Sequence, residues 1–177
     1  MSQATLARPY IRHADLQSSH WYLGSLFSML ATEDDTHGAF GLMEIVARKG
    51  GEPPLHTHTR EDEAFFVLDG RLTFRSADQT MVAESGSFVF LPRGLPHGFS
   101  FETDSVHMLA LVTPGGVDKY FIETGIPAPA FSLPAISTEP VDVALMVEQL
   151  NKYGVDVVGP PLRQLLDAEA AHQDHHR

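Results

Sequence analysis

The sequence predicts an all-β domain, closed as a sandwich or a barrel and followed by a C-terminal helical extension. Between Trp21 and about Val112, short apolar runs alternate with Gly, Pro and Asp residues typical of turns, and helical periodicity is absent. Of the 177 residues, 43% are hydrophobic and 20% are charged, which is ordinary for a globular chain with one core. We therefore expect a single domain over residues 1–177, with its barrel at about 21–113.

Eight strands are expected in the barrel region, each bounded by residues that favour turns. They lie near residues 21–31, 38–48, 63–69, 71–76, 79–84, 87–91, 97–102 and 105–113. Polar turns are expected at Glu33-Asp34-Asp35, Ser76-Ala77-Asp78 and Glu84-Ser85-Gly86. Asp69-Gly70 is the clearest hairpin signal, because Gly at the second position suits the tight turns that join antiparallel strands.

The pattern changes after Thr113. Pro114-Gly115-Gly116 ends the last strand, residues 117–124 suit a short helix, and the prolines within 126–140 indicate a linker over the barrel. Apolar residues at helical spacing predict a helix over 141–153, which Gly154 ends. A second helix is expected from about Pro160 to Ala171. The linker and the helices thus occupy about 114–172.

Charge and cysteine content exclude several functions. The formal net charge is −11, and twelve Lys and Arg spread along the chain do not make the basic field that nucleic acid or an anionic membrane requires. We therefore expect neither partner. With no cysteine in the chain, a metal would need N and O ligands. No apolar stretch approaches the roughly 18 residues of a membrane span, and no leader pattern precedes residue 20, so a cytoplasmic location is expected.

Four residues in the middle of the chain have the spacing of ligands to one divalent metal: His56, His58, Glu63 and His97. They stand in two stretches that also contain glycine and proline, Gly50-x5-His56-x-His58-x4-Glu63-x6-Gly70 and Gly86-x5-Pro92-x-Gly94-x2-His97. Residues i and i+2 of a strand point to the same face, so His56 and His58 can both face the barrel interior. Glu63 joins them if residues 59–62 turn, and His97 must arrive from a distant strand.

Three neutral imidazoles and one carboxylate suit one divalent transition metal per chain, whether Ni, Fe, Mn, Co, Cu or Zn. Such a set leaves one or two coordination positions open, which is more typical of a catalytic site than of a structural one. Any single histidine would be better explained as an ordinary core or turn residue, but the joint pattern favours metal binding. Glu61 and Asp62 fit a solvated turn, with Glu61 as the reserve ligand.

Strand alternation also predicts a substrate pocket beside these ligands. Its expected wall residues are Met43, Ile45, Phe65, Phe99, Phe101, His107, Leu109 and Leu111. His107 is interpreted either as a group that contacts a ligand or the substrate, or as an ordinary wall histidine. The opposite face of the strand at 63–69, with Ala64, Phe66 and Leu68, is apolar and needs a cover, which predicts a homodimer.

The two ligand stretches resemble the paired motifs of the cupin superfamily. Its members are double-stranded β-helix, or jelly-roll, barrels in which three His and one Glu hold a metal. The stretches Arg60-Glu61-Asp62-Glu63-Ala64-Phe65-Phe66-Val67-Leu68 and Phe90-Leu91-Pro92-Arg93-Gly94 also resemble single-domain cupins of the quercetin 2,3-dioxygenase-like kind. In one departure, Phe101 stands where the second motif commonly has Asn, which makes that wall more apolar.

The resemblance implies a metal-dependent dioxygenase that uses O2 to cleave a flavonol or a similar enolic aromatic small molecule. His56, His58 and His97 would hold the metal, and Glu63 would complete the set or take the substrate proton as the catalytic base. An apolar floor beneath Glu63 should raise its pKa. The alternative is a non-oxidative metal-dependent isomerase, cyclase or lyase that acts on a small-molecule metabolite without O2.

Overall fold

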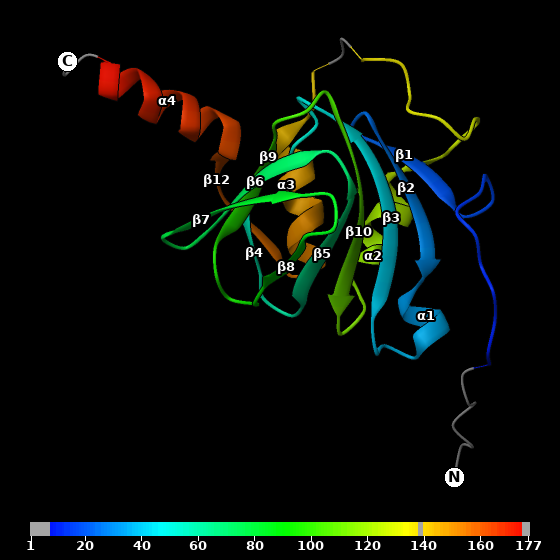
Figure 1. The fold of residues 1–177 in the computed structure, drawn as a ribbon. Coiled ribbons are helices and arrows are strands. Elements are labelled where there is room, and N and C mark those ends of the chain that lie inside the picture. The colour runs from blue at the N-terminus through cyan, green and yellow to red at the C-terminus, as the bar shows by residue number, and fades with distance from the viewer. Residues whose placement is uncertain (1–7, 138–139, 175–177) are drawn as a thin grey trace.

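The computed structural model describes residues 8–137 and 140–174, and its strands form two antiparallel sheets that pack around one core (Figure 1). The first sheet has the order β11-β1-β2-β3-β10-β5-β8 and the second has the order β12-β4-β9-β6-β7. The prediction of an all-β fold with C-terminal helices is confirmed.

The elements of the first sheet are β11 (Ile126–Pro127), β1 (Ser19–Tyr22), β2 (Ser25–Ala31), β3 (Gly41–Arg48), β10 (Ser105–Thr113), β5 (Asp62–Asp69) and β8 (Phe88–Leu91). Those of the second sheet are β12 (Val155–Pro161), β4 (Pro54–His58), β9 (His97–Phe101), β6 (Arg71–Ser76) and β7 (Gln79–Glu84). The helices are α1 (Glu33–Thr36), α2 (Asp118–Thr124), α3 (Val143–Lys152) and α4 (Leu162–Asp174).

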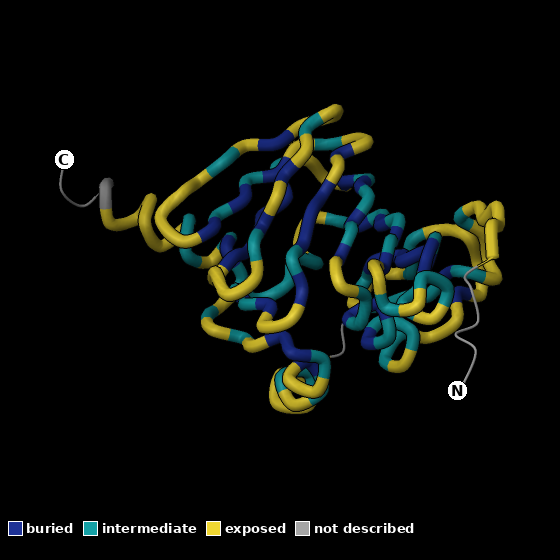
Figure 2. The backbone as a smooth tube through the Cα atoms, turned by 90° about the horizontal axis from the view of Figure 1, so that it is seen from below, coloured by how far each residue is buried: buried dark blue, intermediate teal, exposed yellow. Residues whose placement is uncertain are grey.

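The core lies between the inner faces of the two sheets. In β3 and β10 buried and partly exposed positions alternate strictly, as expected for strands with one covered face, whereas all of β9 is buried. Figure 2 shows the buried positions within the barrel and the exposed ones at loops and along the C-terminal helix α4. The aromatic rings of Phe65, Phe74 and Phe99 pack together at the centre, with centroids 5.4–5.5 Å apart.

The strand expected over 21–31 is two strands, which corrects that prediction. Leu23 and Gly24 form a tight turn between β1 and β2, with φ angles of 45° and 82°. Glycine adopts such a positive φ without steric cost, so Gly24 allows the hairpin. The sequence pattern concealed it because apolar residues continue on both sides of the turn. The turn expected at Glu33-Asp34-Asp35 is the single-turn helix α1, which Thr32 caps.

The C-terminal segment contributes a strand that the sequence analysis missed. The helix expected from Pro160 begins instead at Leu162, and the preceding residues form β12 at the edge of the second sheet. Proline has no N–H to donate to a neighbouring strand. It is tolerated in an edge strand because no strand lies on the open side to require that hydrogen bond. β12 pairs with β4, so that the C-terminal part of the chain lies beside the strand that carries His56 and His58.

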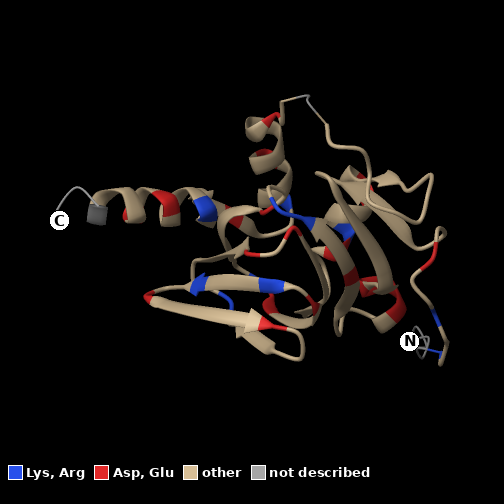
Figure 3. Ribbon diagram, turned by 45° about the horizontal axis from the view of Figure 1, so that its top comes forward, with Lys and Arg blue, Asp and Glu red and all other residues tan. Residues whose placement is uncertain are grey.

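Within the residues that the structure describes, Lys and Arg positions are spread over strands, loops and α4 (Figure 3). Within the described residues, no helix has the length and apolar character needed to cross a membrane.

Candidate metal centre

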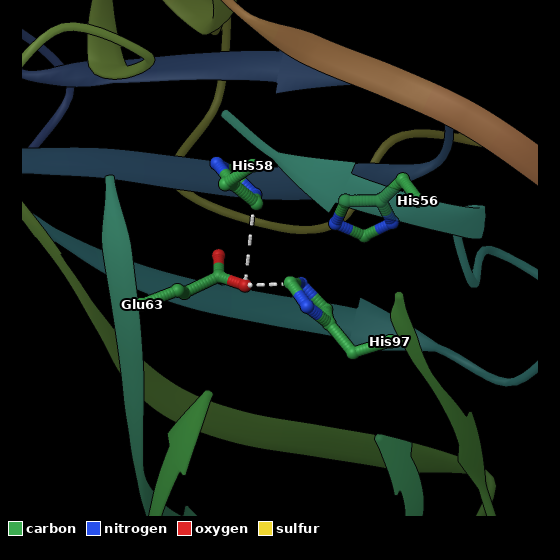
Figure 4. Close-up of side chains that lie close together, drawn as sticks. All are labelled: His56, His58, Glu63 and His97. Carbon is green, nitrogen blue, oxygen red and sulfur yellow. Dashed lines mark ion pairs between the residues drawn. The ribbon is translucent and has the colours of Figure 1, made fainter. Parts of the chain in front are cut away.

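The four predicted ligands come from three strands and meet between the two sheets. β4 contributes His56 and His58, β9 contributes His97, and β5 of the facing sheet contributes Glu63 (Figure 4). His56 and His97 are directly opposite each other in the β4–β9 pair. The alternation of β4 directs the rings of residues 56 and 58 to the same side, where the carboxylate from β5 faces them.

The structure brings these four side chains within coordinating reach of one another. One ligand atom from each residue lies within 4.8 Å of the others, and all four residues are buried. Glu63 Oε2 is 3.2 Å from His97 Nε2 and 3.8 Å from His58 Nε2. His97 is completely inaccessible to solvent, so the centre is shielded from water in this conformation.

The residues fit a divalent metal. Glu63 Oε2 and His97 Nε2 are buried and make no hydrogen bond to any described residue. An unsatisfied buried polar group costs about 1–3 kcal/mol, and coordination to a cation would satisfy both atoms. Three imidazole nitrogens and one carboxylate oxygen are the donors that divalent transition metals accept.

Backbone carbonyls orient two of the imidazole rings. His56 Nδ1 donates to the carbonyl oxygen of Pro54 at 2.7 Å, and His97 Nδ1 donates to that of Leu95 at 3.1 Å. A ring whose Nδ1 carries the proton has its lone pair on Nε2. Both rings are therefore held in the tautomer that offers Nε2 to a metal.

The charges of the site shift its pKa values in opposite directions. Burial, together with the neighbouring His97, lowers the pKa of His56 to about 4. Burial also acts to lower the pKa of His58, but the carboxylates of Glu63 and Glu61 outweigh it, and the net pKa is raised. His56 is therefore neutral and ready to bind a metal over a wide pH range, whereas a proton competes more strongly at His58.

The expectation of a raised pKa at Glu63 is wrong. Burial does act in that direction, but the surrounding imidazoles, above all His58 and His97, outweigh it and hold the pKa of Glu63 well below its usual range. The sequence argument considered the apolar floor and left out the histidines themselves. Glu63 is therefore ionised at neutral pH, as a metal ligand must be.

Five of the predicted pocket residues face the barrel interior. Met43, Ile45, Phe65, Phe99 and Phe101 are all buried in the main core cluster. Their role as a substrate wall stays a prediction, because core packing accounts for the same burial.

The prediction that His107, Leu109 and Leu111 also line the pocket is wrong. Directly opposite residues of an antiparallel pair share a face, and Glu63 is opposite Val112. The inner face of β10 is therefore the one that contains Val112, while residues 107, 109 and 111 lie on the outer face. There His107 Nε2 lies 2.8 Å from Glu44 Oε1.

A second apolar cluster lies beside the centre, and the sequence analysis did not anticipate it. It joins strands to the helices α2 and α3 and contains the buried residues Val112, Val117, Tyr120, Leu150 and Val155. Val112 is opposite Glu63, and Val155 is opposite His58. The helices thus close the barrel next to the ligands. The alternation of apolar and polar residues at 155–157 was the signal in the sequence that could have indicated a strand packed on this cluster.

Glu61 also departs from expectation. It was assigned to a solvated turn, but only 1% of its surface is exposed. Its Oε2 lies 3.5 Å from His58 Nδ1. It does not belong to the group of four that converges on the centre, so its expected role as the reserve ligand is not supported.

Taken together, the two-sheet barrel and its inward set of three His and one Glu define a small β-barrel protein with a candidate metal centre. Residues 43–114 match the family model described as a cupin domain, and this range contains all four ligands. This match over 43–114 confirms the resemblance to the cupin superfamily that the motifs carry.

One curated relative and several solved structures are similar to this chain. The relative is a quercetin 2,3-dioxygenase of Bacillus subtilis (strain 168), which is 23% identical over 133 residues, covering 75% of this chain and 40% of that protein. The chain therefore spans about two fifths of the length of this relative.

Among solved structures, KdgF from Halomonas sp. is 17% identical and has a TM-score of 0.49, covering 54% of this chain and 84% of that one. An RmlC-like cupin from Shewanella frigidimarina NCIMB 400 is 21% identical with the same TM-score, covering 55% and 83% of the two chains.

Replacing one ligand should abolish metal binding. We expect purified His97→Ala to lose most of its bound divalent metal, because the remaining donors leave the coordination set incomplete. Metal content by mass spectrometry and the shift of melting temperature on adding metal are the measurements. A ligand at about 100 times its Kd stabilises a fold by about 2.7 kcal/mol, a gain that His97→Ala should not show. His107→Ala is the matched control, and equal metal loss in both variants would contradict the site.

Metal affinity should fall as the pH falls. Imidazoles bind metal only when deprotonated, and the raised pKa of His58 makes it take up a proton before His56 on acidification. The contribution of the centre is therefore present above this raised pKa and is lost as the pH falls through it. Chelator competition between about pH 8 and about pH 5 measures the effect. An affinity that is constant over this range would argue against histidine ligands.

Proposed function

We propose that this cupin is a metal-dependent dioxygenase that cleaves a flavonol or a similar enolic aromatic small molecule. The observation that carries the proposal is a buried set of three imidazoles and one ionised carboxylate in a barrel whose interior is rich in phenylalanine. Similarity to a quercetin 2,3-dioxygenase supports the same reaction class, although that relative is much longer than this chain.

A bound divalent metal would supply a Lewis acid for the enol or phenol oxygen of the substrate. His56, His58 and His97 are arranged to hold it through Nε2, with Glu63 as the fourth donor. Glu63 Oε2 faces the imidazoles, which leaves Oε1 to accept the proton of the substrate hydroxyl. The lowered pKa keeps Glu63 ionised at neutral pH, so that its carboxylate is free of a proton there, and it also makes Glu63 a weaker base than an ordinary glutamate.

The aromatic interior suits an aromatic substrate. Phe99 packs against Phe65 and Phe101, with ring centroids 5.4 and 5.5 Å away. Such surfaces bind planar rings by edge and face contacts and exclude water from the reacting atoms. Since all four ligands are buried, we infer that the substrate enters when the cover formed by α2 and α3 moves.

The same residues also support a second candidate, a non-oxidative isomerase, cyclase or lyase. The observation that favours it is the ionised Glu63 among imidazoles, since a carboxylate acceptor and a Lewis acid together stabilise an enolate without any oxidant. The two candidates differ in their requirement for O2.

We further propose that the protein is a homodimer through the outer face of β5, β8 and β10. On this face Phe66 is opposite Phe88, Ala64 is opposite Phe90, and the three phenylalanines are 41–65% exposed. β8 is also an edge strand of the first sheet. Glu44 and His107 form a polar pair on the same face. Each chain is acidic as a whole, but this face is mainly apolar. A second copy would therefore cover it without bringing unpaired like charges together.

The dioxygenase proposal predicts oxygen uptake. Metal-loaded protein should consume O2 when a flavonol is added, and Glu63→Gln should lower the rate by about 10²-fold or more, since it removes the proton acceptor. An oxygen electrode gives the measurement. His107→Ala, on the outer face, should keep the wild-type rate. Turnover that proceeds equally well without oxygen would replace this proposal with the non-oxidative one.

The dimer proposal predicts the mass of two chains by light scattering at working concentration. Phe88→Glu should give the mass of one chain, because a charge in the buried interface cannot be solvated. Val82→Glu, at another exposed apolar position outside the three strands, is the control and should remain dimeric. A wild-type protein with the mass of one chain would refute the proposal.

A further inference from the structure

We propose that Glu61 is a positioning residue for the metal centre. Its carboxylate accepts a hydrogen bond from Nδ1–H of His58 and so directs Nε2 of that ring toward the metal. The inference rests on the proposed metal centre and adds to it a group outside the set of four ligands.

The three histidines differ in what contacts Nδ1. In His56 and His97 this atom donates to the carbonyl oxygen two residues earlier in the chain. His58 makes no such bond, and its Nδ1 has no hydrogen-bond partner within the described residues. The group placed beside it is Glu61 Oε2, 3.5 Å away, which is buried and likewise lacks a hydrogen-bond partner. The carboxylate thus stands where the other two rings have a backbone carbonyl.

The gap of 3.5 Å is longer than a hydrogen bond between these atoms, which is usually 2.7–3.2 Å. A small rotation of either side chain closes it. Such contacts in metal and catalytic sites commonly tighten only when the ligand is bound. We infer that Nδ1–H of His58 is directed to Glu61 already in the metal-free protein, and that coordination at Nε2 shortens the contact to hydrogen-bond length.

Glu61 cannot serve as a ligand itself. It contacts the Nδ1 edge of the His58 ring, whereas Glu63 lies 3.8 Å from Nε2 on the other edge. The imidazole therefore separates the two carboxylates, with one on the metal side and one behind the ring. This is the arrangement in which a carboxylate fixes the tautomer of a metal-bound histidine and increases its basicity.

The loop after β10 gives Glu61 its buried place. A Cβ atom at Gly116 would lie 2.9 Å from Glu61 Oε1, so that the absence of a side chain at this position leaves room for the carboxylate. Arg93, which lies close enough to feel the charge of Glu61, is already bound to Asp62 at 2.7 Å. His58 is therefore the group to which the buried carboxylate is directed.

Charge gives this arrangement a further consequence. Burying a carboxylate is costly unless a positive charge compensates it. A divalent cation held by Glu63 and the three imidazoles would place such a positive charge on the far side of the His58 ring from Glu61. Glu61 should therefore strengthen metal binding by charge as well as by orienting His58.

The test compares three variants in metal affinity, measured by chelator competition with Zn²⁺ and Ni²⁺. We expect Glu61→Ala to bind about 10–100-fold more weakly than wild type, the range typical of removing such a supporting group. The metal affinity of Glu61→Gln should lie between those of wild type and Glu61→Ala, because its amide oxygen accepts the hydrogen bond from Nδ1–H but carries no charge. Asp62→Asn, which removes the neighbouring, partly buried charge that pairs with Arg93, is the matched control and should bind like wild type.

A second readout observes the ring directly. Nitrogen-15 NMR of the metal-free protein should show His58 protonated at Nδ1, and this tautomer should be lost in Glu61→Ala while His56 and His97 keep theirs. Gly116→Ala, which leaves Glu61 in place but crowds its Oε1, should weaken metal binding in the same direction. If Glu61→Ala does not fold, the metal affinity of Gly116→Ala tests the same contact.

Unchanged affinity and tautomer in Glu61→Ala would overturn the inference. An equal loss in Asp62→Asn would also overturn it, by showing that charge alone acts. Neither measurement depends on turnover. If the protein shows no oxygen uptake but Glu61→Ala changes metal affinity and the His58 tautomer as expected, the dioxygenase proposal fails and the positioning role of Glu61 stands.

Discussion

The rest of the structure depends on one constraint: three imidazoles and a carboxylate are buried together between two apolar sheets. Such groups are stable there only if each polar atom has a partner. The β4–β9 pairing places His56 opposite His97, and β5 brings Glu63 from the facing sheet. The atoms that point to the centre, including Glu63 Oε2 and His97 Nε2, make no hydrogen bond within the described chain, and this is the physical reason to expect a cation.

The atoms on the outer side of the rings follow the same constraint. Two of the three Nδ1 atoms donate to carbonyls two residues earlier, so the local course of each strand sets the ring orientation. The third lies against Glu61, which a turn and a glycine loop keep buried. The candidate ligands and the groups behind them therefore form one polar unit inside the barrel.

Apolar packing surrounds this unit on both sides. Phenylalanine rings of the main core fill the barrel, and the second cluster, with Tyr120 and Leu150, closes it under α2 and α3. The C-terminal segment thus takes part in the site, because β12 pairs with the strand that carries two of the ligands. The four candidate ligands are buried beneath this packing.

Local spacing determined much of this protein from the sequence by itself. The four candidate ligands, the β class and most strand bounds follow from motifs and from alternation, which are properties of a few consecutive residues. Only the tertiary structure decided which face of β10 is inward, because Val112, Ala110 and Met108 are as apolar as the outer Leu109 and Leu111, and cross-strand register alone selects between them. The edge strand β12 and the burial of Glu61 likewise depend on contacts with residues distant in the chain. The sign of the Glu63 pKa shift was decided in the same way, because it depends on three imidazoles that only the fold brings together.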